Sequence, residues 1–175
     1  MGNMSENESR YTPTRDAVFT ETMQIGIVVC DLDATLRRYV DDYGIGPWEV
    51  HQFKPGDVKD WREHGQPVEP STRFATAMIG QVMWELIQPL DDESIYAQFL
   101  AEKGEGIHHI AVAAPKFDET LAAAAKRGNE LVLSCELSGE FNGIKVVYLG
   151  TERDLGVILE IFSGTPGAEQ EPNAT

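Results

Sequence analysis

Two short stretches of this chain, 85 positions apart, match one another residue by residue, and this repeat constrains the fold more than any other feature. The stretch Met23-Gln24-Ile25-Gly26-Ile27 aligns with the run His108-His109-Ile110-Ala111-Val112. Each stretch is short and apolar, and each precedes a segment with helical spacing, which is typical of a strand that leads into a helix. An internal repeat on this scale indicates a duplicated module.

The remaining elements follow the same order twice. In the first copy we expect a strand at 24–30, a helix that begins at Asp31 and ends at Gly44, and strands at 48–53, 74–79 and 82–87. In the second copy we expect a strand at 107–113, a helix at 117–127, and strands at 131–137, 144–149 and 156–162. This order predicts an α+β fold, in which two βαβββ modules form a curved mixed sheet.

The chain then divides into five parts: a disordered leader at 1–18, a first module at 19–90, a connecting helix within 91–106, a second module at 107–163 and a disordered tail at 164–175. The polar stretch 54–72, which carries several prolines and glycines, lies inside the first module. A stretch of this length in a compact domain is usually a lid, a binding loop or a disordered excursion, and we expect one of these.

Glu85 and Glu160 each interrupt an otherwise apolar strand at equivalent places of the two copies. A carboxylate on a buried face costs several kcal/mol unless it is paired or bound to a metal. On a half-exposed sheet each glutamate would simply face solvent, and this alternative stays open. Because Gln24 and His109 form a second equivalent pair, the four residues together indicate a site that both modules share.

If the sheets curve around a common axis, these four side chains meet. An amide, an imidazole and two carboxylates suit Zn²⁺, Ni²⁺, Co²⁺ or Mn²⁺ with positions left open for water. We therefore predict a divalent metal ion bound by Gln24, Glu85, His109 and Glu160. Since neighbours on a strand point to opposite faces, we expect His108 to face away from His109, as a surface or core-edge histidine.

Composition excludes several classes of protein. The net charge of −15 argues against a nucleic-acid partner, which needs a basic surface. No apolar run is long enough to cross a membrane and the N-terminus lacks a signal pattern, so by elimination we expect a cytoplasmic protein. The two cysteines, Cys30 and Cys135, lack the spacing of a zinc knuckle, and we expect both to be buried, reduced thiols.

The stretch 24–162 resembles the vicinal-oxygen-chelate superfamily, also called the glyoxalase/bleomycin-resistance fold. Three runs resemble methylmalonyl-CoA epimerase in particular: Leu86-Ile87-Gln88-Pro89-Leu90, Ala97-Gln98-Phe99-Leu100 and Gly104-Glu105-Gly106-Ile107-His108-His109-Ile110-Ala111. The ligand set departs from that relative, because the epimerase pattern has histidine where Gln24 stands and glutamine where Glu85 stands. The set present here is instead similar to the metal shell of eukaryotic-type glyoxalase I.

The resemblance implies a divalent-metal-dependent isomerase or epimerase that removes a proton next to a carbonyl or thioester held on the metal. It implies Glu160 as the base, and Glu85 lies opposite it and would return the proton to the other face. The substrate is then a small molecule, with an acyl-CoA as one candidate. Two alternatives stay open: a glyoxalase I-like lactoylglutathione lyase and a non-catalytic protein that binds small molecules such as antibiotics. A homodimer is expected.

Overall fold

A computed structural model of the protein describes residues 13, 16–53, 56–69 and 71–164. The expected leader and tail lie almost entirely outside these residues. In the described part, the strands are β1 Thr22–Val28, β2 Glu49–Gln52, β3 Val58–Glu63, β4 Gln66–Pro67, β5 Thr72–Ile79, β6 Val82–Pro89, β7 Gly106–Val112, β8 Leu131–Leu137, β9 Lys145–Leu149 and β10 Ile158–Phe162. The helices are α1 Leu32–Tyr43, α2 Ile95–Lys103, α3 Phe117–Arg127 and α4 Glu152–Leu155, and a 3-10 turn spans Gly139–Phe141.

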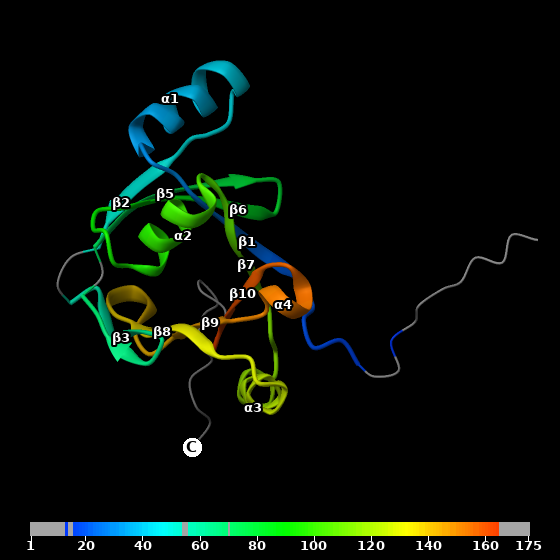
Figure 1. The fold of residues 1–175 in the computed structure, drawn as a ribbon. Helices are drawn as coiled ribbons and strands as arrows, with labels where there is room; N and C mark the ends of the chain where they lie inside the picture. Colours follow the sequence, from blue (N-terminus) through cyan, green and yellow to red (C-terminus); the bar gives the residue numbers. More distant parts are fainter. Residues whose placement is uncertain (1–12, 14–15, 54–55, 70, 165–175) are drawn as a thin grey trace, which may run out of the picture.

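All ten strands belong to one mixed sheet, in the order β2-β5-β6-β1-β7-β10-β9-β8-β3-β4, and Figure 1 shows it curling into a half-barrel. The two halves have the same topology. β1 pairs in parallel with β6, which continues to β5 and β2, and β7 pairs in parallel with β10, which continues to β9 and β8. An antiparallel pairing of β1 with β7 joins the halves. The predicted fold of two βαβββ units in one curved sheet is confirmed.

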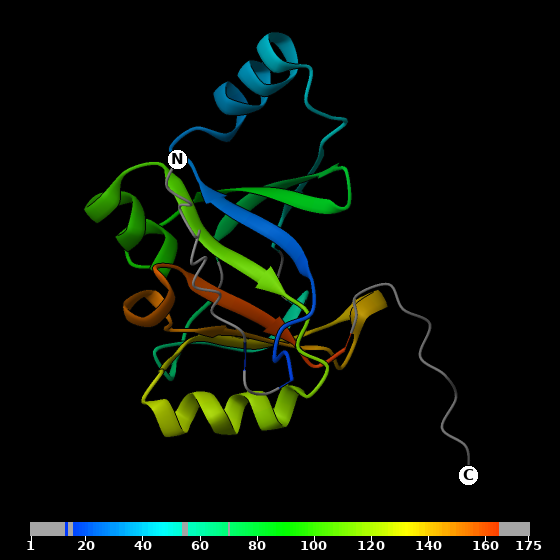
Figure 2. The ribbon, with the colours of Figure 1, turned by 90° about the vertical axis from the view of Figure 1, so that its right-hand side faces the viewer.

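The strands present different side chains to the two faces of the sheet, as their period of two requires. On β6, Leu86 packs outward against α1 together with Leu32 and Ala75, whereas Glu85 and Ile87 line the inner face. On the second half of the sheet, the outward side chains pack around α3 through Ala124, Leu149, Leu159 and Ile161. Figure 2 shows α1 and α3 at opposite ends of the molecule with the sheet between them. The inner face packs against α2 instead, through Ile95 and Tyr96.

The two longer helices of the modules begin and end where the sequence predicts. Asp31 precedes α1, and its carboxylate accepts a hydrogen bond from the Ala34 N–H at 2.9 Å, which satisfies one of the free donors of the first turn. Gly44 and Gly128 follow the last turns of α1 and α3. The connecting helix α2 is shorter than predicted, because Ser94 caps it and it begins only at Ile95.

The expectation of a lid or loop at 54–72 is wrong for most of that stretch. Val58–Glu63 forms β3, which extends the sheet beyond β8 of the other half, and Gln66–Pro67 forms a short edge strand. The hairpin between them turns at His64 and Gly65, which both have positive φ, as in a type I′ turn. The first module therefore supplies the edge of the second one.

The Glu63 carboxylate accepts two hydrogen bonds, one from within β3 and one from the connecting helix. The Trp61 Nε1–H donates to Glu63 Oε1 at 3.1 Å, and the Ile95 N–H at the start of α2 donates to Glu63 Oε2 at 3.0 Å. Glu63 is buried, so its carboxylate needs these donors. Because a helix N-terminus favours a negative charge, the same contact stabilises α2.

Some smaller features differ from the sequence prediction. The short helix α4 and the 3-10 turn lie between the predicted strands of the second module, where no helix was predicted. Cys135 is a buried free thiol as predicted, but Cys30 is exposed because it lies in the turn after β1 has ended.

Within the described residues, no helix is long and apolar enough to cross a membrane.

Candidate functional site

The four predicted ligand residues meet on the inner face of the sheet, where its two halves join. Gln24 lies on β1, Glu85 on β6, His109 on β7 and Glu160 on β10, and these four strands are neighbours at the centre of the sheet. Their register has the predicted symmetry. Glu85 lies beside the residue two positions after Gln24, and Glu160 lies beside the residue two positions after His109.

The centre of the cluster is the Nε2 atom of His109. It lies 3.2 Å from Glu160 Oε2 and 3.7 Å from Glu85 Oε2. The Gln24 side chain completes the group by donating its Nε2–H to Glu85 Oε2 at 2.7 Å. The His109 side chain is fully buried, and the side chains of Glu85 and Glu160 are 16% and 7% exposed. All four residues therefore adjoin one another, mostly out of contact with water.

The backbone at Gly26 makes room for the His109 imidazole. The two residues are register partners across the antiparallel pair β1–β7. A Cβ atom placed on Gly26 would overlap the imidazole ring. The site thus requires a residue without a side chain here, and this requirement is visible in the sequence only after the strands have been paired.

The prediction that His108 faces away from His109 is wrong. The register shifts at this point, because Gly26 pairs with His109 while Ile27 pairs with Ile107, so His108 is bulged out of the ladder. A bulge breaks the alternation of side chains between the two faces. Both imidazoles are consequently buried, and their Nδ1 atoms lie 3.1 Å apart. One of the two rings must donate the hydrogen of this contact.

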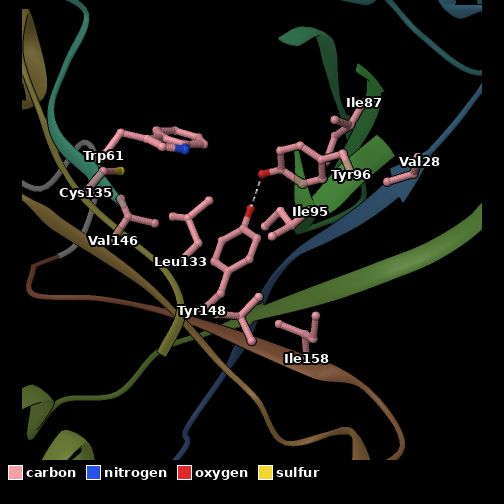
Figure 3. Packing of buried hydrophobic residues seen from close by; sticks show 11 residues of the cluster. Val28, Trp61, Ile87, Ile95, Tyr96, Leu133, Cys135, Val146, Tyr148 and Ile158 are labelled. Carbon is pink, nitrogen blue, oxygen red and sulfur yellow. Dashed lines mark hydrogen bonds between the residues drawn. The ribbon is translucent and has the colours of Figure 1, made fainter. Parts of the chain in front are cut away.

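Two tyrosines that the sequence reasoning missed extend this network. The Tyr148 hydroxyl lies 3.3 Å from His109 Nε2 and 3.0 Å from the hydroxyl of Tyr96. Figure 3 shows the contact between the two tyrosines, which come from β9 and α2. Burial raises the pKa of both phenols well above its usual range, with the charges of Glu85 and Glu160 adding to the effect, so both remain O–H donors. The alternation of side chains along β9 places Tyr148 on the inner face of the sheet. This alternation is the sequence signal that could have identified the residue.

Burial also governs the ionisation of the site. The pKa of Glu85 is raised to about 7, mainly by burial and less by the charge of Glu160, against the opposing effects of His109 and Gln24. Burial lowers the pKa of His108 to about 3, with smaller contributions from His109 and Lys103, so this imidazole is neutral near pH 7. Two carboxyl groups therefore share a buried space that is short of positive charge.

The cluster lies in a cleft of about 660 Å³ on the inner face of the sheet, and Gln24, Glu85 and Glu160 form part of the wall. Most of the remaining wall is aromatic or aliphatic and comes from both halves of the sheet and from β3. Figure 3 shows part of this wall, with Trp61 and Leu133 on one side and Tyr96 on the other. A cleft of this size and chemistry accommodates a small organic molecule.

The residues fit a divalent cation in chemistry, although their side chains are not yet arranged around one. Glu160 Oε2 is buried and accepts no hydrogen bond within the described residues. In the same part of the chain, no group of three or more His, Cys, Asp or Glu side chains is placed to hold a metal ion as it stands. Gln24 would also have to reorient to bind a cation, because its amide turns its nitrogen rather than its oxygen toward Glu85. Turning this amide over would present an oxygen to a cation.

Comparison with known proteins supports this picture of the fold. The family model of the glyoxalase/bleomycin resistance protein/dioxygenase superfamily matches residues 23–148. An uncharacterised protein of Bacillus subtilis, YqjC, is 32% identical over 93 residues, which are 53% of this chain and 66% of YqjC. The match thus spans just under two thirds of that relative.

Solved structures with the same fold include methylmalonyl-CoA epimerases. A variant of the Streptomyces coelicolor epimerase in complex with 2-nitronate-propionyl-CoA has a TM-score of 0.61 and 25% identity, over 85% of this chain and 99% of that chain. The Mycobacterium tuberculosis epimerase has a TM-score of 0.62 and 22% identity, over 87% of this chain and 93% of that chain. At 22% identity the second likeness concerns the fold alone.

Proposed function

Because this chain belongs to the glyoxalase/bleomycin resistance protein/dioxygenase superfamily, we propose that it is a divalent-metal-dependent isomerase or epimerase that moves a proton on the carbon next to a carbonyl group. The likeness to a methylmalonyl-CoA epimerase at 25% identity supports this class of reaction, and an acyl-CoA is one candidate substrate. The observation that carries the proposal is the pair of carboxylates on either side of His109, at the wall of an apolar cleft.

In this proposal Gln24, Glu85, His109 and Glu160 hold Zn²⁺, Ni²⁺, Co²⁺ or Mn²⁺. The support is the convergence of the four side chains and the buried oxygen of Glu160, which has no hydrogen-bond donor in the described part of the chain. A bound divalent ion would polarise a carbonyl oxygen and so make the neighbouring C–H bond more acidic.

His109 is the ligand whose orientation the chain controls most closely. To bind a cation through Nε2, its ring must carry the hydrogen on Nδ1. The contact of 3.1 Å with His108 Nδ1 supplies an acceptor for that hydrogen. We assign His108 the role of a positioning residue that favours this tautomer of His109, as the outer partners of metal-binding histidines generally do.

The two glutamates are suited to opposite halves of a proton transfer. Glu160 reaches the cluster from the second half of the sheet and Glu85 from the first. A carbon held between them would meet one carboxyl group on each face. Glu160 acts as the base that removes the proton, and Glu85 returns one to the other face, which inverts the configuration of the carbon.

The test is deuterium incorporation in heavy water. Metal-loaded protein should introduce deuterium at the α-carbon of methylmalonyl-CoA or a related thioester. Glu160→Gln should slow this exchange by about 10² to 10⁴-fold, the range for a lost acid–base group, while zinc affinity falls far less. Glu102→Gln, an exposed glutamate on α2, is the control and should exchange normally. Absence of exchange with every acyl-CoA and hemithioacetal tested, in protein with one bound metal ion per chain, would reject the proposal.

A glyoxalase I-like lyase is the second candidate, favoured by the ligand set itself. Its chemistry also moves a proton next to a carbonyl, so the two carboxylates keep their roles. The hemithioacetal of methylglyoxal and glutathione separates the candidates, because only the lyase converts it to a thioester. The third candidate is a protein that only binds small molecules. Its ligand would occupy the same cleft, with no deuterium exchange and no requirement for metal.

A further inference from the structure

The cleft carries information about the substrate that the ligand residues alone do not. Its wall includes large apolar side chains from four strands, the 3-10 turn and the residue that follows β2: Trp61, Phe74, Leu133, Phe162, Phe141 and Phe53. Phe53 contacts two other rings, since its ring centroid lies 5.4 Å from that of Trp61 and 5.0 Å from that of Phe74. These three rings form a connected aromatic patch in the wall.

The charge of the site points the same way. Glu85 and Glu160 are both acidic groups in the wall of the cleft. Among the described residues that line the cleft, none is a lysine or an arginine. A carboxylate on the reacting carbon of the substrate would thus lie near two acidic groups and find no basic side chain among these residues to pair with, and burial of an unpaired charge is costly.

We infer that the substrate is a carbonyl compound with a bulky aromatic or branched apolar group on its reacting carbon and no carboxylate there. The apolar group would pack against the aromatic side chains of the cleft wall. The inference rests on the proposed function for the presence of a reacting carbonyl. It separates this protein from an enzyme for a malonyl-type thioester, which carries a free carboxylate on that carbon.

Binding can be measured without catalysis, because Trp61 lies in the wall and reports on its occupancy. The other two tryptophans pack near Tyr39 of α1, away from the cleft lining. Two thioesters of N-acetylcysteamine form a matched pair: the 2-phenylpropanoyl ester is neutral and aromatic, and the methylmalonyl ester is small and anionic. In zinc-loaded protein we expect the phenylpropanoyl ester to change the fluorescence and to bind at least about tenfold more tightly. Trp61→Phe should remove the signal.

Variants distinguish the apolar and the electrostatic parts of the inference. Phe141→Ala, at a partly exposed position, should weaken binding of the aromatic ester several-fold and leave the anionic ester unchanged; Leu133→Phe, which fills the cleft, should do the same. Glu85→Gln removes one acidic group from beside the substrate, so it should strengthen binding of the methylmalonyl ester and not that of the aromatic ester. Zinc content is measured for each variant.

The inference fails if the methylmalonyl ester binds as tightly as the phenylpropanoyl ester, or if the aromatic ester binds equally well to Phe141→Ala and Leu133→Phe. Its failure is distinct from that of the proposed function. Exchange of deuterium into the methylmalonyl ester alone would support the function and overturn the inference. Preferential binding of the aromatic ester without any exchange would do the reverse.

Discussion

At the scale of single residues, His109 is held between a glycine and a second histidine. Gly26 leaves the space for its ring, and His108 lies against its Nδ1 atom. The position of the ring is therefore determined by β1 and by the bulge in β7. Gly26 has no side chain, and His108 is not one of the four residues of the cluster. Both therefore act on the site through His109.

Replacing His108 should weaken metal binding without removing a ligand. His108→Phe keeps the bulk of the ring between Tyr96 and Phe99 but removes the acceptor for the Nδ1 hydrogen of His109. We expect zinc affinity to fall by about 10 to 100-fold, the usual cost of losing such a partner. The measurement is competition with a chelator, and ¹⁵N shifts of His109 report its tautomer.

His108→Gln is the matched variant, because its side-chain oxygen can accept the same hydrogen. It should recover part of the lost zinc affinity and return the His109 signals toward the Nδ1–H form. If His108→Phe bound zinc as tightly as the unmodified protein and left the His109 tautomer unchanged, the positioning role would be refuted.

Glu85 should make the stability of the metal-free protein depend on pH. Its pKa is about 7 in the folded protein, mainly because of burial, against an ordinary value of 4.5. Between these values the folded protein retains a proton that the unfolded chain has lost. The free energy of unfolding should therefore fall as pH rises from about 4.5 to 7, by up to about 3 kcal/mol from this group. Urea titrations in a chelator, compared with Glu85→Gln, measure this contribution.

Glu85→Gln should remove this part of the pH dependence, whereas Glu102→Gln should keep it. Excess zinc should act in the opposite sense on the unmodified protein, because a cation favours the ionised carboxylate and protons compete with it. If the stability of the metal-free protein and that of Glu85→Gln depended on pH in the same way, the pKa of Glu85 would not be raised in the folded protein.

At the scale of elements, β3 links the two halves of the sheet. It is an inserted part of the first module, yet it pairs with β8 of the second and contacts α2 through Glu63. The Glu63 carboxylate thus joins β3 to α2, while the backbone of β3 joins it to β8. Trp61, which forms part of the cleft wall, depends on the same residue.

Removing the Glu63 carboxylate should therefore destabilise the protein. Glu63→Ala leaves two buried donors, the Trp61 indole N–H and the Ile95 N–H, without their acceptor. An unsatisfied buried donor costs about 1–3 kcal/mol, so we expect a loss of about 2–5 kcal/mol in the free energy of unfolding. Urea denaturation followed by far-UV circular dichroism gives the value. Glu102→Ala, at an exposed position on α2, should lower the free energy of unfolding by less than about 0.5 kcal/mol.

Most of the fold could be predicted because the repeat appears twice and each copy supports the other. The long stretch 54–72 has no counterpart in the second copy, so β3 could not be recognised in this way. Its sequence also hides a strand, since Trp61 is its only large apolar side chain besides Val58, and Asp60, with φ of 49°, breaks its regular register. Only pairing with β8 shows that the segment is extended.

The candidate site was predictable to the same extent and for the same reason. The equivalence of the two glutamates identified which side chains meet, because strand register follows from the repeat. The bulge at His108 was not predictable, since it depends on how β7 fits against β1 rather than on either sequence alone. The tyrosine pair was missed because it joins α2 to β9, two elements with no counterpart relation in the repeat.

At the scale of the whole molecule, the proposed metal site has two residues from each half of the sheet. Gln24 and Glu85 belong to the first half, and His109 and Glu160 to the second. A cation bound by all four would stabilise the folded chain as a unit, because it binds the assembled site and not the separated strands. Zinc at 100 times its dissociation constant would add about 2.7 kcal/mol to the free energy of unfolding.

Zinc should accordingly raise the melting temperature of the metal-free protein by about 5–10 °C, the shift that this free energy gives for a chain of 175 residues. Loss of a ligand from either half should reduce the shift, so Glu85→Gln and Glu160→Gln are expected to behave alike, while Glu102→Gln should keep the full response. Differential scanning calorimetry with and without zinc measures each shift. If only one of the two glutamate variants lost the response, the ion would be bound by one half of the sheet. The shared site, and with it the arrangement of one carboxylate on each face of the substrate, would then have to be abandoned.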